Sequence, residues 1–111
     1  MIIGLGDIYA QIPVLEEVRE LMRRTQARVR EQPGCVRYAF TETLEDPGHF
    51  VVVQEWRDLE ALQEHYRSRA FGDYQAGIAP RLVRTSELRL HVAEETLQPV
   101  DSSVIDTSED A

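Results

Sequence analysis

Residues 33–71 read PGCVRYAFTETLEDPGHFVVVQEWRDLEALQEHYRSRAF, and they contain two strand-like segments joined by a turn signal. Segments 35–44 and 49–56 are rich in β-branched and aromatic side chains, which is typical of strands. The Asp-Pro-Gly tripeptide at 46–48 is a turn signal, because proline presets φ and glycine tolerates the left-handed region. Two strands joined by so short a loop predict an antiparallel hairpin.

The register of this hairpin follows from the length of its loop. A three-residue loop at 46–48 places residues whose numbers sum to 94 opposite each other. In that register Tyr38 faces Trp56, and Phe40 faces Gln54, on one side of the hairpin. A slip of one residue would move the two aromatic groups to opposite faces, because side chains alternate along a strand.

Helices are predicted on both sides of the hairpin. Before it, apolar residues recur at steps of three and four over 14–29, and Pro33-Gly34 ends that helix. After it, Asp58 is a typical N-cap residue for a helix over 59–66. The same spacing continues over 67–79, where two glycines weaken the pattern.

Two outer segments, 2–10 and 85–94, have the alternation of strands. The order β-α-β-β-α-β predicts an α+β, ferredoxin-like fold, which is a four-stranded antiparallel sheet with two helices on one face. The strand residues 50–53 are nevertheless apolar on both sides. Since two helices cover only one face of the sheet, we expect a second copy of the chain on the other, and therefore a homodimer.

Composition bounds the function. The chain has 111 residues and a net charge of −8, from 20 acidic and 12 basic residues, which makes nucleic acid and anionic membranes poor partners. Segment 95–111 holds five acids and no base, so we expect one domain over 1–94 and an acidic tail, flexible or reaching onto a partner subunit. No apolar run reaches the roughly 20 residues of a membrane span. The single cysteine and the lack of a signal-peptide pattern favour the cytoplasm.

One histidine stands out among the chemically capable residues. His65 follows Leu62 by three positions and so lies on the apolar face of its helix, where a neutral imidazole needs a partner in the protein or in a ligand. Pattern alone leaves both the structural and the catalytic role open. The three histidines have no ligand spacing, which argues against a metal site. The aromatic residues around the hairpin and second helix would together suit a flat aromatic ligand.

Several short motifs occur in a fixed order: Pro33-Gly34-Cys35-x-x-Tyr38, then Glu45-Asp46-Pro47-Gly48-His49-Phe50, then Glu55-Trp56-Arg57-Asp58 with His65 and Phe71 after it. In this order the chain resembles the antibiotic biosynthesis monooxygenase family, over roughly residues 1–94. The subunits of that family are ferredoxin-like and pair into dimeric α/β barrels. The family includes cofactor-free quinol oxygenases, haem-degrading enzymes, isomerases of signal molecules and proteins with no known reaction.

The resemblance implies a cofactor-independent monooxygenase that oxidises a quinol-like or polycyclic aromatic small molecule with O2, without metal or flavin. Such chemistry needs a base or hydrogen-bonding group near the acidic hydroxyl and a dry aromatic pocket. His65 would be the base or orienting group, and Trp56 the stacking wall. The implied substrate-binding residues are Tyr38, Phe40, Val52, Tyr66, Phe71 and Tyr74.

Two other functions stay open: a non-catalytic small-molecule-binding or stress-response dimer, and an isomerase of a small hydroxyketone metabolite. The chain also departs from parts of the family. Some relatives have a second histidine where this chain has Ala70. Some oxygenase members point a polar strand residue into the pocket, whereas Phe50 and Val52 are apolar.

Overall fold

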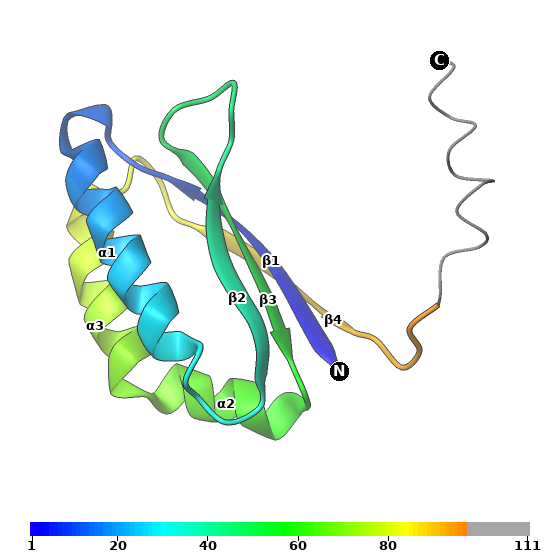
Figure 1. Cartoon of the computed structure of the whole chain (residues 1–111). Coiled ribbons are helices and arrows are strands. Elements are labelled where there is room, and N and C mark those ends of the chain that lie inside the picture. The colour runs from blue at the N-terminus through cyan, green and yellow to red at the C-terminus, as the bar shows by residue number, and fades with distance from the viewer. Residues whose placement is uncertain (98–111) are drawn as a thin grey trace, which may run out of the picture.

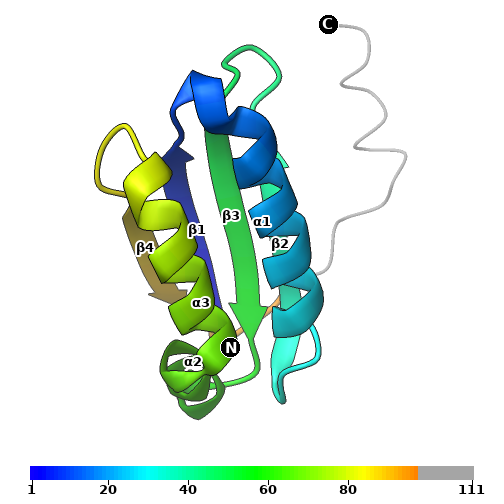
Figure 2. The same ribbon diagram turned by 90° about the vertical axis from the view of Figure 1, so that its left-hand side faces the viewer.

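The computed structural model describes residues 1–97, so most of the predicted acidic tail lies outside the described residues. Four antiparallel strands form one sheet in the order β2-β3-β1-β4, and all helices lie on the same side of it (Figures 1 and 2). The predicted ferredoxin-like α+β fold is confirmed. In chain order the elements are β1 (Ile2–Tyr9), η1 (Ile12–Val14), α1 (Leu15–Val29), β2 (Cys35–Glu42), β3 (His49–Trp56), α2 (Leu59–Arg67), α3 (Arg69–Ile78), η2 (Ala79–Arg81) and β4 (Glu87–Val92).

The register of the β2–β3 hairpin differs from the prediction. Tyr38 pairs with Gln54, and Phe40 with Val52, two positions away from the expected partners. The reason is a longer loop, since β2 ends at Glu42 and β3 begins only at His49. A shift of two positions keeps Tyr38 and Phe40 on the predicted face, so the rings of Tyr38 and Trp56 still meet edge to face, 6.3 Å apart. The pairing shifts once more between Cys35 and Arg37, at an irregularity near the start of β2.

The second helical segment contains two helices rather than one. Ser68 has an extended backbone, which ends α2, and its hydroxyl then accepts a hydrogen bond from the Phe71 N–H to begin α3. Asp58 caps α2 as predicted, since its carboxylate accepts the Ala61 N–H at 2.9 Å. Within residues 1–97 three α-helices therefore lie on this side of the sheet: α3 runs beside α1, and α2 crosses one end of the sheet at an angle to α3 (Figures 1 and 2).

The core lies between the helices and the inner face of the sheet. Its largest fully buried side chains are Trp56, Leu62, His65, Val18 and Val29. The outer face of β1 and β3 is only half-buried, and no helix within residues 1–97 lies on it (Figure 1). Nor is any helix of this described part long and apolar enough to cross a membrane.

Candidate functional site

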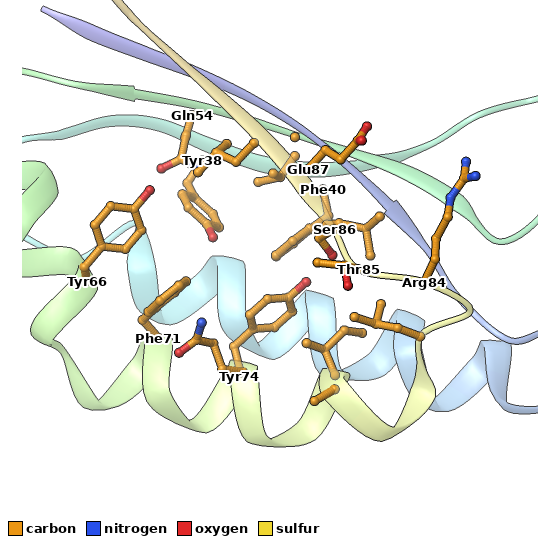
Figure 3. A pocket seen from close by; sticks show the side chains of 18 of the residues that line it. Tyr38, Phe40, Gln54, Tyr66, Phe71, Tyr74, Arg84, Thr85, Ser86 and Glu87 are labelled. Atoms are coloured by element: carbon orange, nitrogen blue, oxygen red, sulfur yellow. The ribbon is translucent and has the colours of Figure 1, made fainter.

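A cavity of about 650 Å³ opens between the inner face of the sheet and helices α2 and α3 (Figure 3). Strands β1, β2 and β3 supply one wall, and the segment from Leu82 to Leu88 closes one end. Gly6 lies in the strand wall, where a Cβ atom would stand only 3.0 Å from Val52 Cγ1 and 3.1 Å from the Glu87 carbonyl oxygen. The missing side chain at Gly6 therefore helps to keep this space open.

All six residues expected to bind a substrate line this cavity: Tyr38, Phe40, Val52, Tyr66, Phe71 and Tyr74. The sheet contributes Tyr38, Phe40 and Val52, and the helices contribute the rings of Tyr66, Phe71 and Tyr74. Figure 3 shows the labelled aromatic rings from both sides. Phe40 and Tyr74 meet across the cavity with ring centroids 5.3 Å apart. The two walls therefore present aromatic rings to the same space, which favours a flat apolar ligand.

The three tyrosines also supply polar atoms. No hydrogen bond within residues 1–97 engages their hydroxyl groups, and none of these oxygens is sealed from solvent. Burial raises the pKa of Tyr38, Tyr66 and Tyr74 above the ordinary value. The hydroxyls therefore stay protonated at neutral pH, as groups that can donate a hydrogen bond to a ligand.

His65 lies behind the aromatic wall and does not line the cavity. His65 is 1% exposed, and its Nδ1 forms a hydrogen bond with the Gln32 Oε1 at 2.9 Å. The rings of Tyr66 and Phe71, which do line the cavity, stand 5.5 and 5.0 Å from it. Burial lowers its pKa to about 4, so the ring is neutral at physiological pH.

Two features of the His65 site remain distinctive. Its Nε2 is sealed from solvent and has no hydrogen-bond partner within residues 1–97. Its ring stacks on Trp56 at 4.8 Å, and Trp56 is itself 0% exposed and absent from the cavity lining. The pair expected to be catalytic thus packs together directly behind the residues expected to bind the substrate.

Gln54 is a lining residue that the sequence reasoning missed. It lies on the inner face of β3, 3% exposed, and its Oε1 accepts the Trp56 Nε1–H at 2.7 Å. Gln54 places a polar side chain on the strand face where Phe50 and Val52 are apolar. The period of two through Phe50, Val52 and Trp56 was the signal that could have found it.

The far end of the cavity is polar. Thr85 and Ser86 line the cavity there, whereas the guanidinium of Arg84 points away from the labelled rings of the cavity in Figure 3. That guanidinium stacks over the Tyr9 ring at 3.8 Å. No sequence motif marks Thr85 or Ser86, which reach the site only because β4 pairs with β1. Among residues 1–97, no group of three His, Cys, Asp or Glu side chains could hold a metal ion.

The sequence model of the antibiotic biosynthesis monooxygenase family matches residues 1–77. The chain belongs to this family. The match covers β1 through most of α3, and so includes every residue expected to contact a substrate.

Solved structures agree with the family assignment. A crystal structure of an antibiotic biosynthesis monooxygenase is 25% identical, covers 86% of this chain and 100% of its own, and superposes with a TM-score of 0.80. Rv0793 from Mycobacterium tuberculosis has 20% identity, coverage of 87% and 98%, and a TM-score of 0.80. A mutant of SnoaB, a cofactor-independent oxygenase from Streptomyces nogalater, has 21% identity, coverage of 88% and 97%, and a TM-score of 0.75. The last two establish likeness of fold.

A curated relative is less informative about activity. An uncharacterised protein of Synechocystis is 25% identical over 95 residues, which is 86% of this chain. The chain spans only 65% of that relative's length.

Proposed function

We propose that this member of the antibiotic biosynthesis monooxygenase family is a cofactor-independent monooxygenase that oxidises a quinol-like or polycyclic aromatic molecule with O2. The observation that carries the proposal is the cavity with aromatic rings on both walls. Its volume of about 650 Å³ lies within the range of roughly 300–1,000 Å³ that is typical of small-molecule sites. Such walls bury a flat ring system and exclude water from it.

The reaction can be written for anthrone, a tricyclic ketone, as test compound. Loss of a proton from its CH2 group gives an electron-rich aromatic oxyanion, which supplies all four electrons that O2 accepts. One oxygen atom becomes the new ring carbonyl of anthraquinone. The other leaves as water with the two hydrogens of the CH2 group, so atoms and electrons balance.

The cavity residues would act by stabilising the oxyanion. The hydroxyls of Tyr38, Tyr66 and Tyr74 remain protonated and have no protein partner within residues 1–97, so each can donate to a developing negative charge. Stabilising the anion lowers the pKa of the bound substrate, whose proton is lost to the solvent outside the cavity. His65 would then be an orienting group, a role supported by its burial behind Tyr66 and Phe71 and by its lowered pKa.

Isotope labelling tests this proposal. Protein treated with a chelator is given anthrone under oxygen-18 gas, and the product is analysed by mass spectrometry. The proposal predicts anthraquinone carrying one labelled atom at a rate above the spontaneous oxidation. Binding without oxidation would instead support the small-molecule-binding dimer. Conversion of a hydroxyketone under anaerobic conditions would support the isomerase.

We also propose that the chain functions as a homodimer in which a second copy covers the outer face of the sheet. Ile3, Leu5, Val51 and Val53 form a half-buried apolar strip along β1 and β3. The Arg37–Glu55 ion pair flanks this strip, since Glu55 pairs with Ile3 across the strands. An apolar centre with a polar rim is the usual composition of a protein interface. Sedimentation should give a dimer for the native chain and a monomer for Val53→Glu, and a native monomer would refute this part.

A further inference from the structure

Gln54 is a buried amide whose orientation is determined by its neighbour. The indole N–H of Trp56 can only donate, so the Gln54 atom 2.7 Å from it must be the carbonyl oxygen Oε1. The amide NH2 group consequently points away from the indole. Trp56 therefore decides which end of the Gln54 side chain is left for other contacts.

The NH2 group of Gln54 is left without a partner. No hydrogen bond within residues 1–97 engages it, although the residue is 3% exposed. Among residues 1–97, the side-chain nitrogen that is both sealed from solvent and without a hydrogen-bond partner is His65 Nε2. The Gln54 nitrogen also has no partner but is not sealed, so it keeps a small accessible surface. Gln54 is itself one of the residues that line the aromatic cavity. A buried donor with no protein partner is a place where a ligand oxygen gains a hydrogen bond.

The neighbouring strand accommodates this arrangement. A Cβ atom at Gly4 would lie 2.8 Å from Gln54 Cγ, so a larger residue there would push the amide out of its position. Gln54 lines the cavity together with Tyr38 and Tyr66, and the three side chains are labelled in Figure 3. The free donor thus lies where the edge of a ring system packed among these aromatic groups would carry an oxygen substituent.

We propose that Gln54 donates a hydrogen bond to a ring oxygen of the ligand, a quinone carbonyl or the oxyanion of a quinol, and that Trp56 is a positioning residue that holds this amide without touching the ligand. The inference rests on the proposed function only in that the cavity takes an oxygenated aromatic ring. The inference names Gln54 as the residue that makes the cavity bind an oxygenated ring more tightly than the corresponding hydrocarbon.

A matched pair of probes isolates this hydrogen bond. 2,3-Dimethyl-1,4-naphthoquinone and 2,3-dimethylnaphthalene share a ring system and differ in two carbonyl oxygens, and the methylated quinone carbons are blocked against addition of the half-buried Cys35 thiol. Both dissociation constants are measured by ligand-observed NMR on one sample of each variant. Their ratio does not depend on what fraction of that sample is folded.

The expected changes in this ratio are specific. Gln54→Met should lower the preference for the quinone by about tenfold, which is the contribution of one hydrogen bond. Trp56→Phe keeps the ring but frees the amide to turn, and should lower the preference by about threefold. The double variant should equal Gln54→Met alone. The double variant removes both hydrogen-bonding partners, so it leaves no indole N–H without an acceptor. If Gln54→Met folds poorly, the effect of Gln54 is read by comparing the double variant with Trp56→Phe.

Two results would overturn the inference: an unchanged ratio in Gln54→Met, or a further loss from Trp56→Phe in the Gln54→Met background, which would mean that the indole itself contacts the ligand. Failure of both probes to bind the native protein would overturn it as well. If the ratio follows Gln54 but anthrone is not oxidised, the proposed reaction fails and the inference stands. If anthrone is oxidised while the ratio ignores Gln54, the inference fails and the reaction stands.

Discussion

The burial of His65 makes stability depend on pH in a way that one substitution should remove. The folded protein holds the pKa of this imidazole at about 4, against an ordinary value of 6.5. At pH 7.5 both the folded and the unfolded chain carry a neutral ring, so the shift has no effect. Between pH 6.5 and 4 the His65 imidazole is protonated in the unfolded chain but stays neutral in the folded chain, so the free energy of unfolding falls as pH falls. At pH 4.5 the loss is about 2.5 kcal/mol.

The assay compares the native protein with His65→Leu by urea denaturation at pH 7.5 and 4.5. Leucine cannot be protonated, so the difference in unfolding free energy between the two proteins should shift by about 2.5 kcal/mol in favour of the variant at the lower pH. Glu42, whose pKa the Arg19 guanidinium lowers, also loses stabilisation in acid, but it does so in both proteins and cancels. His91→Gln, which removes an exposed imidazole from β4, is the control and should follow the native protein.

A difference that stays constant between the two pH values would refute the reasoning. It would mean that His65 reaches solvent or an acid partner in the folded protein. The orienting role proposed for His65 would then lose its support, because an accessible imidazole of ordinary pKa could serve as a base.

Other predictions concern the helices that form the cavity wall. Gly72→Ala in α3 has open space around the new methyl group and should stabilise the protein by about 0.8–1.0 kcal/mol. Gly34→Ala should destabilise it by about 2 kcal/mol, because Gly34 has φ +81° and the added Cβ would stand 2.5 Å from the Ala61 side chain. Both changes are measured from urea midpoints, and the same sign for both would contradict the assigned geometry. Asp58→Ala should cost about 1 kcal/mol through loss of the α2 cap, while Asp58→Asn should cost much less, since an amide oxygen still accepts the Ala61 N–H. Equal thermal shifts for the two Asp58 variants would show that the cap is not what matters.

The aromatic wall was predictable because periodicity projects directly onto faces. Tyr38 and Phe40 share a face by the strand period, and Phe71 and Tyr74 share one by the helix period. These faces survive an error of two positions in the hairpin register, because two is the repeat of a strand. The register of the hairpin depends on the length of its loop. Asp-Pro-Gly marks only residues 46–48, whereas the loop extends from Thr43 to Gly48.

The depth of each side chain could not be predicted in the same way. Spacing from Leu62 puts His65 on the buried face of α2, but it does not reveal that the imidazole stays out of the cavity lining and packs against the lining rings of Tyr66 and Phe71. That arrangement follows from the break at Ser68, where α3 starts in a new direction. Thr85 and Ser86 depend on long-range pairing of β4 with β1, which no local pattern reports.

The central claim is that the aromatic cavity is where the ligand reacts. Val52→Phe adds a ring from β3 into this space, and Val36→Phe adds the same ring at an exposed position on β2. The measurement is the initial rate of O2 uptake with anthrone by chelator-treated protein, for the native chain and both variants. We expect uptake by the native protein and by Val36→Phe, and a loss of at least tenfold in Val52→Phe, which corresponds to about 1.4 kcal/mol of transition-state stabilisation. Equal rates for Val52→Phe and the native protein would contradict it.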